Sequence, residues 1–515
     1  MTQNSKPRGR DQGVTGTSVG PLRPLLVLAV AFALAYGCDG GEGQARPPNV
    51  IFILADDLGW TDTGAYGSQY YETPHIDALA QRGMTFTNAY AAAAICSPTR
   101  ASILTGLHPA RIGITTAAGH LEREVLEKSL RSRGPANQPA LIANSLTRLR
   151  LDYFTLAEAL GAAGYRTAHF GKWHLGREPF DPLNQGFEID LPHTHGPGPS
   201  GGYLGPWNFW PGEGADGEHI EDRMATEAAE FIRQNSERPF FLNYWCFSVH
   251  APIQGKPDLV DKYRAKADPK MAQRNPIMGA MVESLDDAVG TLLSVIDEVG
   301  IADETIIVFF SDNGGMVHRL NAGVPVTSNL PLRSGKSSIY EGGVREPLIV
   351  AWPPLVTPGS RSDEIVQSID FYPTLLELTG VPAREGQSFD GVSIVPALKG
   401  AALDREAIFV HSPQYSAATL HRPSTSVRRG DWKLIRFHCD GPDQQDRHEL
   451  YDLAKDIGET TDLAGQQPQI VGELSALLDR FLADTEAVVP RPNPQYQPGT
   501  DPFPNGPALR EDGPA

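Results

Sequence analysis

Short runs of consecutive apolar residues alternate along this chain with segments in which apolar residues recur at helical spacing. The clearest runs are NVIFILA from Asn49, the run that ends at Phe170, FFLNYWCFSV from Phe240 and TIIVFFS from Thr305. Apolar runs of this length, without polar alternation, predict strands that are buried on both faces of a sheet. LIVAWPP from Leu348 predicts a further strand.

The segments between these runs have the pattern of amphipathic helices. They are IDALAQRG from Ile76, TLAEALGAAG from Thr155, RMATEAAEFIRQ from Arg223, PIMGAMVESLDDAVGTLLSVIDEVG from Pro276 and YPTLLELTG from Tyr372. In the last segment Pro373 suits a first helical turn and Gly380 suits a C-terminal cap. Strands that alternate with helices predict an α/β fold with a large, mainly parallel sheet flanked by helices.

The pattern changes after about residue 395. RRGDWKLIRFH and HELYDLAKDIGETTDLA predict paired strands and a turn, which lead into a helix from Val471. We therefore expect a large domain over residues 49–395 and a smaller C-terminal subdomain with an antiparallel sheet over 396–487. The tail at 488–515 is rich in Pro, Asn and Gly, and we expect it to be irregular or disordered because it has little to bury.

The N-terminus has the composition of an export signal. Lys and Arg residues precede an apolar stretch from Leu25 to Ala35, which suits a signal sequence but is too short to span a membrane. The following Tyr36, Gly37 and Cys38 complete a site that resembles bacterial lipoprotein processing sites, although Ala35 replaces the usual larger aliphatic residue. We expect a signal peptide at 1–37, lipidation of Cys38 and a linker at 38–48, in a periplasmic or cell-surface protein. Plain signal cleavage is the alternative.

Charge and cysteine content restrict the function. The formal net charge is −18 over 515 residues, which disfavours nucleic acid and anionic membrane surfaces as partners. An anionic substrate would therefore need a local cationic pocket. The four cysteines, Cys38, Cys96, Cys246 and Cys439, are too few for a disulfide framework. Without Cys38 their number is odd, so at least one is unpaired in an oxidising compartment, which calls for a chemical explanation; a Cys246–Cys439 disulfide stays open.

Polar residues follow the predicted strands at their carboxyl ends, where open parallel sheets bind ligands. Asp56 and Asp57 follow the first strand, and Asp312 and Asn313 follow the strand from Thr305. Each pair alone is typical of a turn or a helix cap. Together, three carboxylates and an amide form an oxygen-ligand set that suits Ca²⁺ or Mg²⁺, and Ca²⁺ is the better candidate.

The segment CSPTRASILTG from Cys96 predicts a loop that enters a short helix ended by Gly106. Pro98 is tolerated in a first turn, where free backbone NH groups would face an oxyanion. Arg100 follows Cys96 closely enough to share that site. The remaining candidate cations are Lys172, His174, His250 and Lys336. Taken singly, each of these residues is more typical of a solvated or structural side chain. Only their occurrence together indicates a functional site.

The segment CSPTRASILTG resembles the signature of the formylglycine-dependent (type I) sulfatases, cysteine type. Further blocks that are similar to this family, in its order, are NVIFILADDLGW, TPHIDALA, GYRTAHFGKWHLG, VHAP, FFSDNGG and GKSSIYEGGVREP. GDWKLIR and ELYDLAKDIGETTDLA resemble its C-terminal lobe, so the resemblance extends from about Asn49 to Asp484. It implies the fold of the alkaline phosphatase superfamily and an arylsulfatase-like hydrolysis of a sulfate ester.

The resemblance also implies roles for the candidate residues. Cys96 would be oxidised to formylglycine by a formylglycine-generating enzyme. One Ca²⁺ would be bound by Asp56, Asp57, Asp312, Asn313 and the modified Cys96. The residues that would bind sulfate and move protons are Arg100, Lys172, His174, His250 and Lys336. Thr99 stands where many members have serine, a change that we expect to be tolerated.

Two other functions are alternatives to a sulfatase, and the sequence also bears on the class of substrate. A phosphate ester or phosphonate hydrolase of the same superfamily, in its two-metal form, would commonly have a histidine where this chain has Asn313. A non-catalytic lipoprotein that binds sulfated glycans would keep Cys96 unmodified. For an enzyme, we expect a sulfated carbohydrate over a simple aryl sulfate. The loop from His193 to about residue 214, with His195, has aromatic faces that suit a sugar, but an ordinary surface loop has the same composition.

Overall fold

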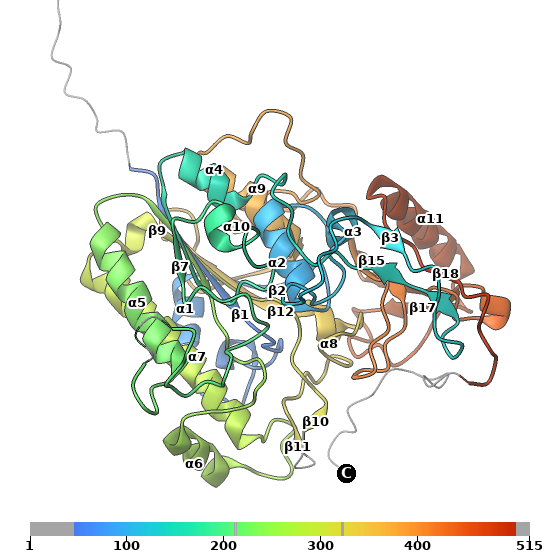
Figure 1. Cartoon of the computed structure of the whole chain (residues 1–515), viewed down its shortest axis with the longest axis horizontal. Coiled ribbons are helices and arrows are strands. Elements are labelled where there is room, and N and C mark those ends of the chain that lie inside the picture. Colours follow the sequence, from blue (N-terminus) through green and yellow to red (C-terminus); the bar gives the residue numbers. More distant parts are fainter. Residues whose placement is uncertain (1–45, 211, 213, 321–323, 501–515) are drawn as a thin grey trace, which may run out of the picture. The chain divides into compact units, whose positions relative to one another are not determined.

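The computed structural model describes residues 46–210, 212, 214–320 and 324–500 (Figure 1). The predicted signal peptide, Cys38 and the last residues of the predicted tail lie outside these ranges. Within them, none of the helices combines the length and apolar character needed to cross a bilayer.

An eight-stranded sheet organises the larger part of the protein, in the order β13-β2-β12-β9-β1-β8-β6-β7. Its strands are β1 (Asn49–Ala55), β2 (Met84–Tyr90), β6 (Arg166–Gly171), β7 (Ile189–Leu191), β8 (Phe240–Trp245), β9 (Thr305–Ser311), β12 (Arg345–Ala351) and β13 (Ser360–Gln367). β1 pairs in parallel with β8 and β9, β6 does so with β7 and β8, and β13 with β2. β12 is antiparallel to both of its neighbours. The prediction of a mainly parallel sheet is confirmed.

Helices cover both faces of this sheet, which explains why β1, β8 and β9 are buried along their whole length (Figure 1). One face packs against α1 (Pro74–Arg82), α5 (Ile220–Asn235) and α7 (Pro276–Glu298). The other packs against α2 (Cys96–Thr105), α4 (Leu156–Ala162), α9 (Phe371–Thr379) and α10 (Val395–Leu398). Side chains of β1 alternate between these two cores: Ile51 and Ile53 belong to the first, Phe52 and Leu54 to the second.

A four-stranded antiparallel sheet forms the smaller part. Its strands are β14 (Ile408–Ser412), β15 (Ser424–Arg429), β16 (Trp432–Phe437) and β17 (Arg447–Asp452), in that order. Leu474 and Leu478 of α11 (Pro468–Asp484) pack on one face of this sheet, against Val427 and Leu434. The paired strands predicted from RRGDWKLIRFH and HELYDLAKDIGETTDLA are present as β16 and β17, whereas of β15 the predicted segment contains only Arg428 and Arg429.

Short elements complete the chain. They are α3 (Pro109–Ile112), α6 (Pro257–Lys266), α8 (Glu341–Val344), β3 (Ser129–Leu130), β4 (Ala140–Leu141), β5 (Ala143–Asn144), β10 (Arg319–Leu320), β11 (Val324–Pro325) and β18 (Arg491–Pro492). The expectation of an irregular tail is wrong for β18, which pairs with β4. The physical reason is that Asn493 donates hydrogen bonds to the carbonyls of Pro135 and Gln138, at 2.9 and 2.8 Å.

Candidate active site

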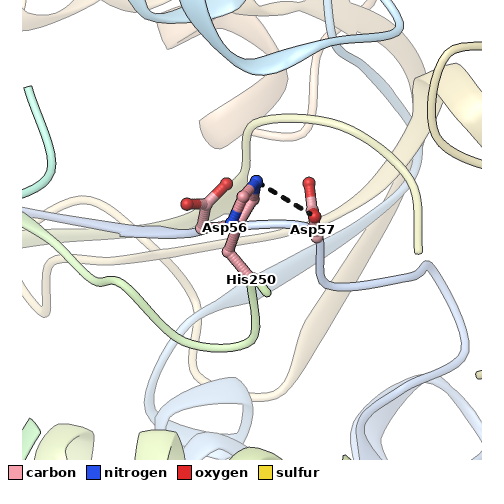
Figure 2. A group of neighbouring side chains, drawn as sticks. All are labelled: Asp56, Asp57 and His250. Carbon is pink, nitrogen blue, oxygen red and sulfur yellow. Dashed lines mark ion pairs between the residues drawn. The ribbon is translucent and has the colours of Figure 1, made fainter. Parts of the chain in front are cut away.

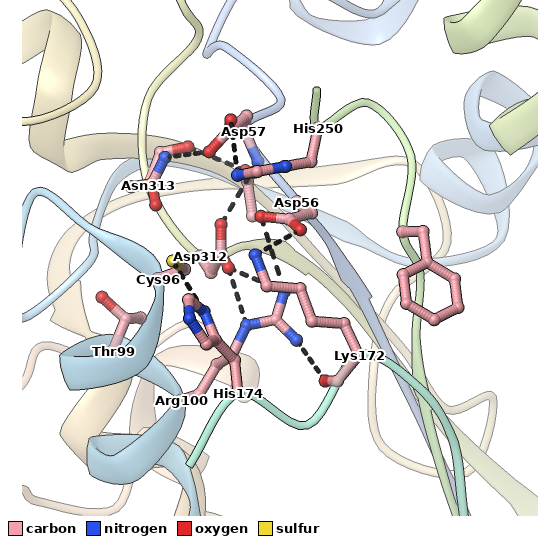
Figure 3. Close-up of polar contacts among 12 residues, drawn as sticks. Asp56, Asp57, Cys96, Thr99, Arg100, Lys172, His174, His250, Asp312 and Asn313 are labelled. Carbon is pink, nitrogen blue, oxygen red and sulfur yellow. Dashed lines mark hydrogen bonds and ion pairs between the residues drawn. The ribbon is translucent and has the colours of Figure 1, made fainter. Parts of the chain in front are cut away.

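Four of the five residues predicted to bind a metal, Asp56, Asp57, Asp312 and Asn313, lie together at the carboxyl ends of β1 and β9 (Figure 3). These strands are adjacent and in register, with Ala55 opposite Ser311, so the residues that follow them meet at one level. The backbone NH of Asp57 donates to Oδ1 of Asp312 at 3.2 Å, and Nδ2 of Asn313 donates to Oδ1 of Asp57 at 2.8 Å. All four side chains are buried.

Two acceptor atoms of this group are buried without a hydrogen-bond donor, namely Oδ1 of Asp56 and Oδ1 of Asn313. A buried acceptor without a donor costs free energy, which a cation between oxygen atoms would recover. Asp56, Asp57 and His250 also bring one ligand atom each within 4.8 Å of one another (Figure 2). The residues therefore fit a metal ion, and their oxygen-rich donor set favours Ca²⁺ or Mg²⁺.

Three cations face the three carboxylates. Nζ of Lys172 lies 2.6 Å from Oδ2 of Asp56, and Nζ of Lys336 lies 2.7 Å from Asp57. Arg100 pairs with Asp312, and its NH1 donates to the carbonyl of Lys172 at 2.6 Å. Three of the predicted cations therefore meet at this site, each paired with a carboxylate.

Burial and these ion pairs compete in setting the pKa values. Burial, opposed by Lys172, raises the pKa of Asp56 to about 8. Burial also acts to raise the pKa of Asp57, but Lys336 and His250 outweigh it and hold that pKa below its ordinary value. Conversely, the charge of Asp57 raises the pKa of Lys336 in spite of burial. Lys336 therefore stays protonated in this site.

Cys96 begins the buried helix α2, which Gly106 ends with a left-handed φ of 67°, as predicted. Its Sγ lies 3.3 Å from Nδ1 of His174. Burial, opposed by Lys172 and Lys336, raises the pKa of the Cys96 thiol. The unmodified residue is therefore a neutral thiol and a poor nucleophile.

The two histidines that were predicted at the site face it from different loops. His174 is buried and has a left-handed φ of 57°, a strained conformation for a residue other than glycine. Burial and the nearby Lys172 hold the pKa of His174 well below its usual value. His250 donates from Nδ1 to the carbonyl of Ala251 at 2.7 Å, so its Nε2, 3.8 Å from Asp57, is the nitrogen that faces the site.

A third histidine, His120, lies beside His174, and the described cysteines are not paired in disulfides. His120 was not predicted, and its Nδ1 lies 2.8 Å from Nε2 of His174; no motif surrounds it in the sequence. Thr99 donates from Oγ1 to the carbonyl of Ala93 at 3.1 Å, a contact that fixes the loop entering α2. Cys96, Cys246 and Cys439, the cysteines in the described ranges, are all buried free thiols.

Comparisons with known proteins identify the family of this chain. The Sulfatase family model matches residues 48–381, and the model of the N-sulphoglucosamine sulphohydrolase C-terminal region matches residues 334–485. The chain is 32% identical to arylsulfatase A of Homo sapiens, across 93% of this chain and 94% of that protein. It is 33% identical to a sulfatase of Formosa agariphila, across 82% and 85%.

Solved structures extend the comparison. The structure of Ps i-CgsB in complex with k-i-k-neocarrahexaose has a TM-score of 0.68 and 27% identity, covering 85% of this chain and 93% of that one. The phosphonate monoester hydrolase of Agrobacterium radiobacter, with a TM-score of 0.57, 19% identity and coverage of 86% and 99%, shares the fold. On the family match and the full-length similarity to curated sulfatases, the chain belongs to the sulfatase family and is a sulfuric ester hydrolase.

Proposed function

We propose that this protein removes sulfate from a carbohydrate, giving an alcohol and inorganic sulfate, through a formylglycine formed at Cys96. The observation that carries the proposal is the position of Cys96. It begins a buried helix, with the cations of Lys172 and Lys336 close enough to affect its pKa and His174 in contact with its side chain. In a chain of net charge −18, this cluster is where an anionic ester would find compensating charge.

The proposed cofactors supply chemistry that the unmodified side chains lack. A hydrated formylglycine carries two hydroxyls on one carbon, one that attacks sulfur and one that later expels sulfate. A single Ca²⁺ bound by Asp56, Asp57, Asp312, Asn313 and residue 96 would polarise a sulfate oxygen and lower the pKa of the attacking hydroxyl. The buried oxygens of Asp56 and Asn313 that lack a hydrogen-bond donor support this ligand set.

The remaining side chains bind the ester and move protons. Arg100, Lys172 and Lys336 carry the charge that would stabilise the sulfate oxygens as the S–O bond breaks. His250, with Lys336, would protonate the leaving oxygen; the contact of both side chains with Asp57 and their partial exposure at the site support this role. His174 faces residue 96 and would take the proton of the hydroxyl that expels sulfate.

Relatives with sugar substrates support the carbohydrate part of the proposal. The N-acetylgalactosamine-6-sulfatase of Homo sapiens is 31% identical, across 88% of each protein. The structure of Ps i-CgsB contains a neocarrahexaose. A sulfated glycan, or a small sulfated sugar, is therefore the substrate class that we propose.

Maturation and location belong to the same proposal. A formylglycine-generating enzyme would convert Cys96 during export, and a lipid at Cys38 would anchor the protein to a membrane. Replacing Cys38 by Ala in the native host tests the anchor. The proposal expects the protein to move from the membrane fraction to the soluble fraction; unchanged partition would leave plain signal cleavage.

The test of the proposed function is a desulfation screen on protein from the native host. Sulfated mono- and oligosaccharides are incubated with the wild type, with Cys96→Ala and with Cys439→Ala, which removes a buried cysteine of the C-terminal sheet region. We expect sulfate release by the wild type and by Cys439→Ala, none by Cys96→Ala, and an aldehyde on the Cys96 peptide by mass spectrometry. A persistent thiol at Cys96 together with no sulfate release would overturn the proposal.

A further inference from the structure

A histidine outside the predicted set links the active site to solvent. Nδ1 of His120 lies 2.8 Å from Nε2 of His174, and the ring centroids are 5.0 Å apart. The other ring nitrogen of His174, Nδ1, lies 3.3 Å from Sγ of Cys96. His174 is 1% exposed, whereas His120 is partly exposed. Cys96, His174 and His120 therefore form a row of polar contacts that runs from the buried start of α2 to the surface.

The backbone on both sides of His120 is held in place. Arg148, which is 2% exposed, donates from NH1 to the carbonyl of Gly119 at 3.2 Å and from NH2 to that of Leu121 at 2.7 Å. A Cβ atom at position 119 would lie 2.0 Å from the carbonyl oxygen of His174. Glycine is therefore required for the loop to pack this closely on the backbone of His174, and the two imidazoles meet as a consequence.

Contact between two neutral imidazoles requires one nitrogen to donate and the other to accept. If Nε2 of His174 donates to Nδ1 of His120, then Nδ1 of His174 carries no proton and faces residue 96 as an acceptor. The opposite tautomer would present an N–H to residue 96. His174 can take a proton from residue 96 only in the first arrangement, in which its Nδ1 carries no proton.

We infer that His120 is a positioning residue, which fixes His174 in the tautomer that accepts a proton from residue 96 and which carries a proton onward to solvent. The inference rests on the proposed function. A proton leaves the hydroxyl of residue 96 for Nδ1 of His174. The electron pair of the broken O–H bond forms the C=O bond of the aldehyde, while the C–O bond to sulfate breaks and its electron pair leaves with the sulfate. The Nε2 proton of His174 passes to Nδ1 of His120, and His120 releases its Nε2 proton to water. Each ring keeps one proton, so neither imidazole becomes charged, and the negative charge leaves with the sulfate.

Burst kinetics with an aryl sulfate test the kinetic role, because phenol release precedes sulfate release in this scheme. We expect His120→Ala to keep the initial burst of phenol and to lower steady-state turnover by about tenfold. This is less than the roughly 10²–10⁴-fold effect of a lost general acid or base, because His120 acts through His174. Imidazole in the buffer should restore part of the turnover, because the lost ring is partly exposed. His120→Asn keeps an acceptor for Nε2 of His174 but cannot relay a proton, so its turnover should also be low.

Nitrogen NMR of the unconverted thiol protein provides a readout other than activity. We expect His174 to be protonated at Nε2 in the wild type and in His120→Asn, and to lose this preference in His120→Ala. His75→Ala, which removes an exposed histidine of α1 on the opposite face of the sheet, is the matched control and should change neither the tautomer nor the turnover.

Three results would overturn the inference while leaving the proposed function intact. They are unchanged turnover in His120→Ala, an equal fall of burst and turnover without rescue by imidazole, and a wild-type His174 that is protonated at Nδ1. Failure of the proposed function looks different, because a wild type with aldehyde at residue 96 would then release neither phenol nor sulfate.

Discussion

Arg100 joins the helix that begins at Cys96 to the end of the central strand β9: its Nε and NH2 atoms lie 2.8 and 2.7 Å from Oδ2 of Asp312, and both side chains are fully buried. The same guanidinium lies 3.7 Å from Asp56, at the end of β1. One side chain therefore holds α2 against the two strand ends that carry the proposed metal ligands.

Removing this guanidinium should destabilise the fold. Arg100→Met leaves Asp312 buried without its partner, and we expect the free energy of unfolding to fall by about 3–5 kcal/mol, as for other broken buried ion pairs. Urea unfolding of the metal-free protein measures the change. The control is Arg82→Met, which removes a pair with Asp297 whose side chains are 44% and 46% exposed and should cost about 1 kcal/mol or less. Equal effects of the two changes would contradict the structural role of Arg100.

Calcium should stabilise the protein through Asp57 and its neighbours. A ligand that binds the folded state alone adds about 2.7 kcal/mol at a hundredfold excess over its dissociation constant. Calcium should therefore raise the melting temperature of the wild type, and EGTA should reverse the change. Asp57→Asn should abolish this response, whereas Asp190→Asn, at a buried carboxylate that pairs with His193, should keep it. A normal calcium response in Asp57→Asn would rule out the proposed ligand set.

Glu221 should make stability depend on pH. Its Oε1 accepts hydrogen bonds from the backbone NH groups of Phe247 and Ser248 at 3.0 and 2.7 Å. Burial, opposed by these hydrogen bonds, raises its pKa from 4.5 to about 7. Between these two values the folded protein keeps a proton that the unfolded chain releases, so the free energy of unfolding falls as pH rises, by about 3 kcal/mol in total. Below pH 4.5 this stabilisation is complete, and above pH 7 it is lost.

Glu221→Gln isolates this effect. The variant cannot ionise at position 221. Its unfolding free energy should therefore fall less between pH 5 and pH 8 than that of the wild type. Urea unfolding at both pH values gives the difference between the two proteins, in which all other titrating groups cancel. Parallel pH dependence of the two proteins would show that Glu221 does not titrate in this range.

Lys433 connects the C-terminal sheet to the loop that carries Lys336. Its Nζ lies 2.8 Å from Oε1 of Glu341, which follows that loop, and 2.9 Å from Oε1 of Glu459. Lys433→Met leaves two buried carboxylates without this cation, so we expect a loss of about 3–5 kcal/mol in unfolding free energy. Lys455→Met, at a pair whose lysine is 83% exposed, is the control and should be nearly neutral. If Lys433→Met leaves the unfolding free energy unchanged, the C-terminal sheet and the loop that carries Lys336 are held together by other contacts.

The predicted strands are those with two buried faces. β1, β8 and β9 have continuous apolar sequences because helices cover the sheet on both sides. Of the eight strands in this sheet, β2 and the two edge strands, β7 and β13, were not predicted. In SRSDEIVQ of β13 several polar residues are exposed, and such a sequence is equally typical of a loop. Its assignment depends on pairing with β2, which is distant in sequence.

The site was predictable where it depends on strand ends. Asp56, Asp57, Asp312 and Asn313 follow apolar runs directly, so their meeting requires only a parallel sheet. The position of His120 depends on a loop that folds back onto His174, through Gly119 and Arg148. Such contacts between distant segments leave no local pattern in the sequence.

The most direct test of the central claim compares the release of sulfate and phosphate from matched aryl esters by converted protein loaded with calcium. The proposed chemistry predicts faster turnover of the sulfate ester, with no release by Cys96→Ala. Faster turnover of the phosphate ester, or sulfate release that persists in Cys96→Ala, would contradict it.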